Sequence, residues 1–125
     1  MGARIKIVVG SVEAEAELLD NETAHRICEA LPIDGSGSTW GDEIYFTISV
    51  ECDPEADARA EVEVGDLAYW LAGSGFCIFY GRTPMSTGDN PVAASEVNVF
   101  GKIIGDPSVF REIRSGEHVH IAKAE

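Results

Sequence analysis

Positive charge is the scarcest property of this sequence. Nine Lys and Arg residues stand against 22 Asp and Glu in 125 residues, which gives a formal net charge of -13. A surface of this kind repels the phosphate backbone of nucleic acids and the anionic headgroups of lipids. We therefore expect neither nucleic acid nor a membrane among the partners of this chain. We interpret the acidic surplus as a feature that keeps the protein dissolved.

Long hydrophobic runs are also missing. No stretch approaches the roughly 18 apolar residues that are needed to span a bilayer. The N-terminal segment Met1–Leu19 has neither the long apolar core nor the small-residue cleavage site of a secretory signal. We therefore expect a cytoplasmic protein.

Cysteines are few and widely spaced. Cys28, Cys52 and Cys77 form no Cys-x-x-Cys pair, and three is not the number of a disulfide framework, so we interpret each as a small buried side chain. The sequence also lacks the Gly-x-Ser-x-Gly signature of a serine nucleophile and the Gly-rich loop that binds phosphates. The residues thus identify no catalytic group, and we expect no cofactor.

Short strand patterns make up most of what the sequence contains. Residues 4–10 are compactly apolar, and residues 12–18 alternate between apolar side chains and glutamates, so the two segments predict a hairpin through Gly10-Ser11. Similar patterns predict further strands at residues 43–50, 61–64, 67–71, 76–80, 97–104 and 118–122.

Helix signals occur twice. Asn21 is a favourable cap for a helix that runs to Leu31 and is ended by Pro32, and Pro107 begins a second short helix that reaches Arg114. Residues 34–38 indicate a flexible loop by their Gly and Ser content, and the acidic residues 52–60 indicate a loop or a poorly ordered connection.

These elements do not alternate regularly between strand and helix, which argues against a doubly wound parallel sheet. We predict one domain over residues 1–125. Its fold class is mainly β: a closed antiparallel barrel of about eight strands with two short helices.

Several segments resemble cyclophilins. The segment Val97–Ile103 is similar to a cyclophilin strand with a Val-Phe-Gly-Lys core. The resemblance is closer to an atypical, short cyclophilin-like family of bacteria and archaea that has no assigned function. The segments that carry it are Leu31–Ile33, Trp40–Phe46, Val64–Trp70, Thr83-Pro84 and Val97–Val99. The resemblance implies the cyclophilin-like barrel, although a fold does not by itself give a function.

The resemblance also implies a test for prolyl isomerase activity. Cyclophilins use an arginine to polarise the prolyl amide, and this position falls on Tyr45 or Phe46, depending on a one-residue register. The pocket positions held there by glutamine and phenylalanine fall on Gly75 and Cys77, and those of tryptophan and histidine fall near Met85 and Val97. Peptidyl-prolyl isomerase activity is therefore the alternative hypothesis, in which Arg82 would have to supply the missing cation.

The first hypothesis is a binding module. The resemblance places aromatic side chains on the segments that line the groove of cyclophilin-like barrels, and strand parity places Tyr45 and Trp70 opposite the expected core. The groove would accept a peptide or a small apolar ligand. The expected ligand-binding residues are Trp40, Glu43, Tyr45, Trp70, Cys77, Phe79, Thr83 and Met85. A homo-oligomer whose aromatic face is covered by a second copy is the third hypothesis.

Two histidines alternate on the last predicted strand. His118 and His120 share one face, and a carboxylate such as Glu117 or Asp106 is the nearest candidate in sequence for a third metal ligand. Because two histidines without a recognisable third ligand are a weak signal, we expect no metal site here.

Overall fold

The computed structural model describes residues 3–124, and it begins with the predicted hairpin. Strands β1 (Arg4–Val9) and β2 (Val12–Leu18) pair antiparallel with Val9 opposite Val12. Gly10 between them has a φ of 56°, a left-handed conformation that glycine adopts without strain. The hairpin turns its apolar side chains inward and leaves its glutamates exposed, as the alternation predicts.

Helix α1 (Glu22–Ala30) follows the hairpin and confirms the predicted cap. The Asn21 side chain accepts a hydrogen bond from the backbone N–H of Ala24 at 2.8 Å. The second helical segment, η1 (Pro107–Glu112), is a 3-10 helix with Asp106 as its cap and Pro107 in its first turn. Both expected helices are therefore present.

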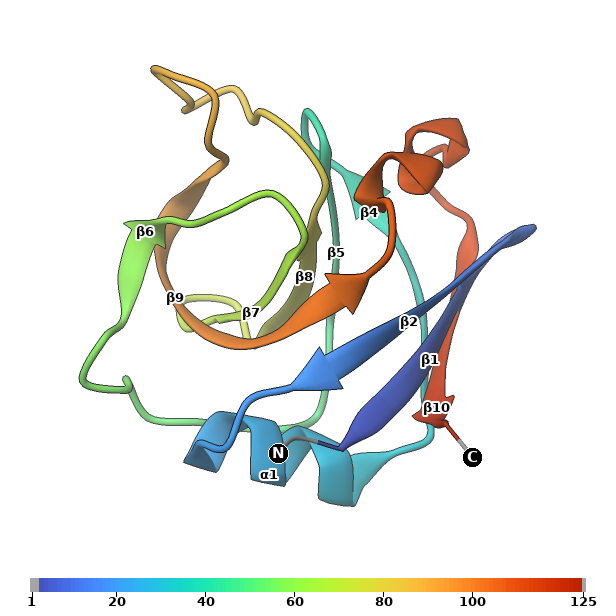
Figure 1. Ribbon diagram of the computed structural model, residues 1–125. Coiled ribbons are helices and arrows are strands. Elements are labelled where there is room, and N and C mark those ends of the chain that lie inside the picture. Colours follow the sequence, from blue (N-terminus) through green and yellow to red (C-terminus); the bar gives the residue numbers. More distant parts are fainter. Residues whose placement is uncertain (1–2, 125) are drawn as a thin grey trace.

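The remaining strands occur close to the predicted segments. They are β3 (Ile33–Ser36), β4 (Ser38–Thr39), β5 (Glu43–Thr47), β6 (Arg59–Glu61), β7 (Asp66–Trp70), β8 (Gly75–Phe79), β9 (Val92–Ile104) and β10 (His118–Lys123). Strand β9 begins at Val92, well before the predicted start at Val97, and it curves through the molecule so that it pairs with β2, β6 and β7 (Figure 1).

The prediction of a closed eight-stranded barrel is wrong. The sheet has ten strands in the order β3-β10-β1-β2-β9-β7-β8-β5-β4, with β6 paired to β9 off this path. Its two end strands, β3 and β4, are separated in the chain only by Gly37, too few residues for a hairpin between them. No ladder joins them within residues 3–124, so the sheet is antiparallel but not closed.

The prediction of a flexible loop at residues 34–38 is also wrong. Its Gly and Ser content is typical of a loop, but β10 supplies partners for β3, and β5 supplies partners for β4. A backbone hydrogen bond from Gly37 N–H to the Glu117 carbonyl oxygen, 2.9 Å long, holds the point where the two strands meet. Tertiary partners thus override the local composition.

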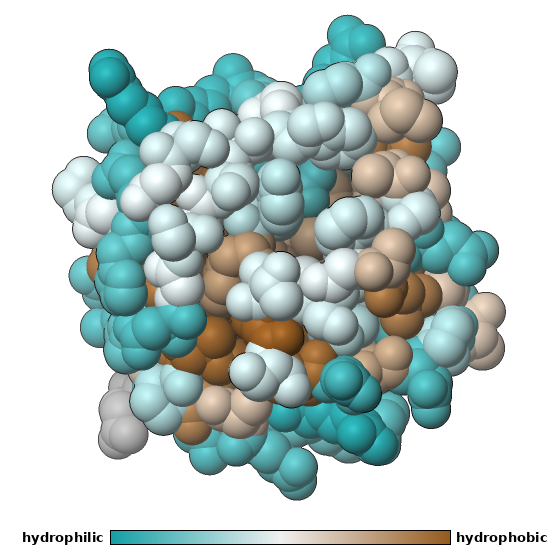
Figure 2. All heavy atoms as spheres, turned by 180° about the vertical axis from the view of Figure 1, so that it is seen from behind, coloured by the Kyte–Doolittle hydropathy of each residue, from teal (hydrophilic) through white to brown (hydrophobic). Residues whose placement is uncertain are grey.

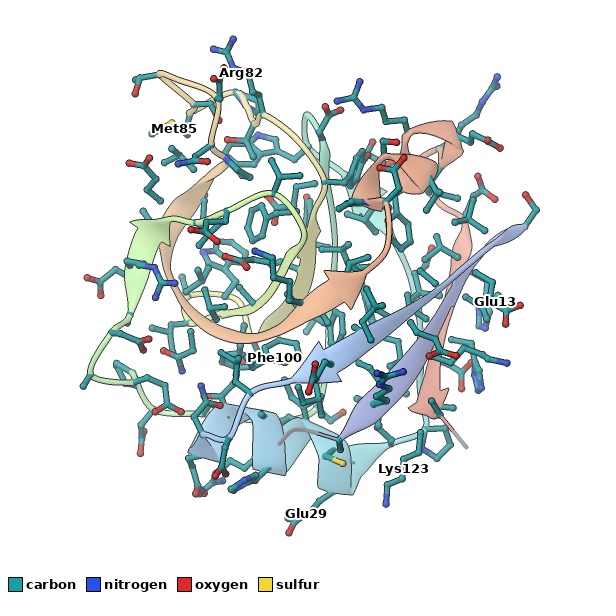
Figure 3. All side chains as sticks on the ribbon, in the orientation of Figure 1. Glu13, Glu29, Arg82, Met85, Phe100 and Lys123 are labelled. Carbon is teal, nitrogen blue, oxygen red and sulfur yellow. The ribbon has the colours of Figure 1, made fainter. Side chains whose placement is uncertain are left out.

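Two hydrophobic clusters lie on opposite faces of the sheet. The main core is built around Phe46, Phe76 and Phe100, whose rings stack or meet edge to face with centroids 5.4 and 5.1 Å apart. Figure 3 shows Phe100 between β9 and α1. The second cluster lies on the other face of β7, β8 and β9. It consists of Val62, Ala68, Cys77, Phe79, Ala93, Val97 and Val99.

The described part of the chain contains no helix that is long and apolar enough to cross a membrane. In the view from behind, most of the surface is hydrophilic, and hydrophobic residues are visible in the lower centre and along the right side (Figure 2).

Candidate functional site

A cavity of about 200 Å³ lies over the second cluster. Its position follows from strand register, because Tyr45 lies opposite Cys77, Cys77 opposite Ala68, and Ala68 opposite Val99 across four neighbouring strands. Residues directly opposite one another on paired strands project from the same face of the sheet. Small side chains in the middle of this row leave space between larger ones at its sides.

Trp70 forms one wall and is fixed from two directions. Its indole N–H donates a hydrogen bond to Ser95 Oγ at 2.7 Å. Its ring packs against Gly73 so closely that a Cβ atom at this position would overlap it. The polar edge of the ring is therefore satisfied while an apolar part faces the cavity.

A tight turn after β4 brings Trp40 and Glu43 to the same cavity. The Trp40 backbone N–H donates to the Glu43 carbonyl oxygen at 2.9 Å, and Gly41 adopts a positive φ of 60° within the turn. Glu43 is the first residue of β5, two positions before Tyr45, so both side chains project from the same face.

Glu43 is the polar group of this otherwise apolar site. Only 5% of the residue is exposed. Burial raises the pKa of its carboxyl group to about 7, and a hydrogen-bonding interaction with the Cys77 thiol opposes the shift. Burial, together with the neighbouring Glu43 charge, also raises the pKa of the Cys77 thiol well above its ordinary value. The thiol is therefore held protonated and is a poor nucleophile.

Five of the eight residues predicted to bind a ligand line this cavity, namely Trp40, Glu43, Tyr45, Trp70 and Cys77. The other three do not. Phe79 is fully buried within the second cluster, Thr83 is buried and donates a hydrogen bond from its hydroxyl to the Val92 carbonyl oxygen, and Met85 is 52% exposed on the loop before β9 (Figure 3).

Sequence reasoning missed the part of the lining that β9 supplies, which is Ala93, Ala94 and Val97. Val97 was identified from the sequence only as the residue near the cyclophilin histidine position and was not among the expected ligand-binding residues. The two alanines precede the predicted strand and carry no chemical signal of their own.

The cavity has no cation among the described residues that line it. Of the two positions that match the cyclophilin arginine, Phe46 lies in the main core and Tyr45 faces the cavity. Arg82 is exposed, points away from the body of the molecule, and donates to the Ser86 carbonyl oxygen (Figure 3). It therefore does not supply the cation that isomerase chemistry would require.

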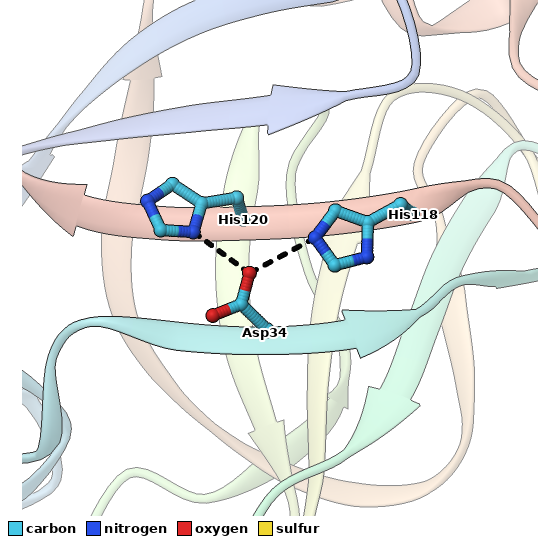
Figure 4. A group of neighbouring side chains, drawn as sticks. All are labelled: Asp34, His118 and His120. Carbon is cyan, nitrogen blue, oxygen red and sulfur yellow. Dashed lines mark hydrogen bonds and ion pairs between the residues drawn. The ribbon is translucent and has the colours of Figure 1, made fainter.

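The two histidines of β10 have a third partner that the sequence did not indicate. Neither Glu117 nor Asp106 joins them, because Glu117 accepts from the Arg114 backbone N–H and Asp106 caps η1. Asp34 of β3 lies between the two imidazole rings instead (Figure 4). The sequence offered no recognisable third ligand for these histidines, and the fold supplies Asp34 as a potential one.

Comparisons with known proteins agree on the fold. A family model described as Cyclophilin-like matches residues 3–122. The solution structure of a hypothetical protein from Archaeoglobus fulgidus is 40% identical over 98% of this chain and 95% of that chain, with a TM-score of 0.83. No curated protein matches the sequence significantly.

A more distant likeness is to the structure of McbB in complex with tryptophan, which is 12% identical with a TM-score of 0.69. It covers 95% of this chain but 44% of that chain, so this chain spans less than half of that one. At this identity the likeness extends to the fold alone.

Proposed function

The chain belongs to the cyclophilin-like family, and from this premise we propose that it is a binding domain that takes a small apolar group in the cavity between Trp40, Tyr45 and Trp70. The observation that carries the proposal is the composition of the cavity, in which three aromatic side chains surround a single buried carboxyl group. Apolar walls with one placed polar group are typical of small-molecule sites.

The volume of the cavity limits what fits. An apolar cavity of about 150 Å³ in another protein holds benzene. At about 200 Å³, this cavity accommodates one ring with a short substituent, either as a free molecule or as a side chain of a peptide. A proline side chain is also small enough for a cavity of this volume.

Charge selects among such ligands. Glu43 is the only charged group that lines the described cavity, and the whole chain carries a net charge of -13. An ammonium group on the ligand would pair with the Glu43 carboxylate and lie near aromatic faces, both of which favour a cation. A carboxylate at the same place would meet a like charge without a cationic partner.

A series of three ring compounds tests the proposal. Benzylamine, benzyl alcohol and benzoate share one ring and differ in charge. The only two tryptophans of the sequence, Trp40 and Trp70, both line the cavity, so intrinsic fluorescence reports on its occupation. We expect benzylamine to bind most tightly and benzoate least. Benzylamine affinity should rise with pH near pH 7, because Glu43 ionises there.

Matched variants locate the binding. Ala94 is exposed and lines the cavity, whereas Ala56 is exposed elsewhere, so Ala94→Phe should abolish binding and Ala56→Phe should leave it unchanged. If Ala94→Phe binds benzylamine as the parent does, the cavity is not the site. A homo-oligomer that covers this face predicts instead that none of the three compounds binds and that the mass in solution is a multiple of the chain mass.

A further inference from the structure

Asp34, His118 and His120 form a cluster on β3 and β10, and none of the three lines the cavity. The His118 Nε2 atom lies 2.9 Å from Asp34 Oδ1, and the His120 Nδ1 atom lies 2.8 Å from the same oxygen (Figure 4). All three potential ligand atoms lie within 4.8 Å of one another. Two imidazoles therefore converge on one carboxylate oxygen from the same side of the sheet.

Strand register builds this arrangement. His118 and His120 are two residues apart on β10, so their side chains leave the same face, and Asp34 lies directly opposite His120 on the neighbouring strand β3. The alternate positions, such as Val119 and Ile121, point into the main core. The cluster is thus fixed by backbone pairing on its inner side and open to solvent on its outer side.

The donor set is one that transition metals prefer. Two imidazole nitrogens and a carboxylate oxygen leave at least one coordination position for water, as in open zinc sites. In a tetrahedral zinc site, ligand atoms are about 3.3 Å apart, given metal–ligand distances of about 2.0–2.1 Å. A metal that takes the place of these two hydrogen bonds would therefore lengthen each nitrogen–oxygen distance by about 0.5 Å, and the two imidazole nitrogens, which lie within 4.8 Å of each other, would adopt the same spacing.

The protonation states also suit a metal. Asp34 supplies the carboxylate oxygen of the donor set, and both imidazole rings lie within hydrogen-bonding distance of it. Each histidine can carry its proton on the ring nitrogen that faces solvent, which leaves the other nitrogen free to coordinate. The side chains of His118, Asp34 and His120 are 68%, 53% and 43% exposed, so a hydrated ion reaches them directly.

We propose that Asp34, His118 and His120 form a binding site for a divalent first-row transition metal of the zinc type, which links the end strand β3 to β10. A metal at this place joins two strands where the sheet ends, so binding stabilises the folded chain. Without a metal, the same residues form two hydrogen bonds, and the end strand depends on its four paired residues.

Calorimetric titration with zinc chloride tests the site, using protein that has been dialysed against a chelator. We expect a single zinc ion per chain. The unfolding temperature should rise by several degrees with saturating zinc. His118→Ala, His120→Ala and Asp34→Asn should each weaken binding at least about tenfold, because even the loss of an outer partner of a metal ligand has effects of this size.

The remaining histidine provides a matched control. His25 is exposed and pairs with Asp20 at 2.7 Å, so it offers the same two residue types, and no third ligand joins them within residues 3–124. The variant His25→Ala should therefore bind zinc as the parent does. Cobalt absorption adds a second control, because an intense thiolate-to-metal band would assign the ion to Cys28 or Cys52. A thiolate band, zinc loss in His25→Ala, or full affinity in His120→Ala and Asp34→Asn would overturn the proposal.

Backbone amide NMR keeps the test independent of variant stability. Zinc added to the parent protein should shift or broaden the signals of residues 33–36 and 118–121 and leave those of α1 unchanged. Shifts confined to α1, or no shifts at all, would show that these residues do not bind the metal.

Discussion

Glu43 is a carboxylic acid that lies buried in an otherwise apolar cavity. An ionised carboxylate is costly to bury without a charged partner, and the described cavity provides none. Its pKa of about 7 in the folded state exceeds the ordinary value of 4.5 that applies in the unfolded chain. Between pH 4.5 and about pH 7, the folded state therefore keeps a proton on Glu43 that the unfolded state has released.

The free energy of unfolding should accordingly fall as the pH rises from 4.5 to about 7. The loss is about 3 kcal/mol, because each pH unit by which the two pKa values differ is worth about 1.4 kcal/mol. Glu43→Gln removes the ionisable group, so the variant should lack this decline and be more stable than the parent above pH 7. Urea unfolding of both proteins from pH 4 to pH 9 measures the difference.

All other ionisable groups are the same in the two proteins, so the comparison removes their contribution. Parallel curves for the parent and Glu43→Gln would show that the folded state tolerates the charge without cost. The same result would weaken the expectation that benzylamine binding depends on Glu43 ionisation.

Residue-level reasoning from the sequence located one side of the cavity and missed the other. The period-two pattern placed Tyr45 and Trp70 on the face of the sheet that points away from the core residues Phe46 and Tyr69. The structure confirms this, because Phe46 and Tyr69 lie in the main core while Tyr45 and Trp70 pack against the second cluster. Asp34 could not be found in this way, because it approaches His118 and His120 across 84 and 86 residues of chain. Only the pairing of β3 with β10 brings them together, and that pairing leaves no local signal.

At the scale of elements, local signals succeeded where the chain itself supplies the stabilising partner. The side chain of Asn21 caps α1, and Gly10 adopts the positive φ that the turn between β1 and β2 requires. Strands β3 and β4 were mistaken for a loop because their partners come from distant segments. Counting strands also said nothing about which of them pair, so it could not distinguish an open sheet from a closed barrel.

Hydrogen bonds from a buried residue of β9 and from α1 hold the acidic connection before β6 in place. The Asn98 side chain accepts from the Glu55 backbone N–H at 2.8 Å and donates to the Asp53 carbonyl oxygen at 2.9 Å and to Thr23 Oγ1 at 3.0 Å. The sequence suggested a loop or a poorly ordered connection. The segment is a loop, but it is joined to β9 through Asn98 and to α1 through the Glu55 carboxylate, which accepts from the Thr23 backbone N–H at 2.9 Å and from Thr23 Oγ1 at 2.7 Å.

Asn21 joins two elements, and its contributions can be separated. Its Oδ1 atom caps α1, while its Nδ2 atom donates to the Val99 carbonyl oxygen of β9 at 3.0 Å. Asn21→Ala loses both bonds and should lower the free energy of unfolding by about 2 kcal/mol. Asn21→Ser retains a capping oxygen and loses only the bond to β9, so about half of that loss is expected.

Urea unfolding midpoints of the parent and the two variants measure these effects. Equal losses in Asn21→Ala and Asn21→Ser would mean that the cap contributes nothing. No loss in Asn21→Ser would mean that the bond to Val99 contributes nothing.

At the scale of the whole molecule, acidic charge dominates the surface. The ion pairs among the described residues, such as Lys6–Glu13 and Lys102–Glu63 at 3.0 Å, are exposed and contribute little each. The chain has 22 acidic and nine basic residues, so at least 13 carboxylates have no cation of the chain left to pair with. Their mutual repulsion is part of the cost of folding.

This repulsion predicts that the protein is more stable in salt. The Debye length shortens from about 30 Å at 0.01 M to about 10 Å at 0.1 M ionic strength, so repulsion between separated carboxylates is screened first. Thermal unfolding should therefore shift upward by several degrees over this range, and most of the gain should precede 0.5 M. Sodium chloride and choline chloride should act alike, because screening depends on ionic strength and not on a bound cation. A gain with sodium alone would indicate specific binding, and an unfolding temperature that falls with salt would mean that the surface ion pairs outweigh the repulsion of the unpaired carboxylates.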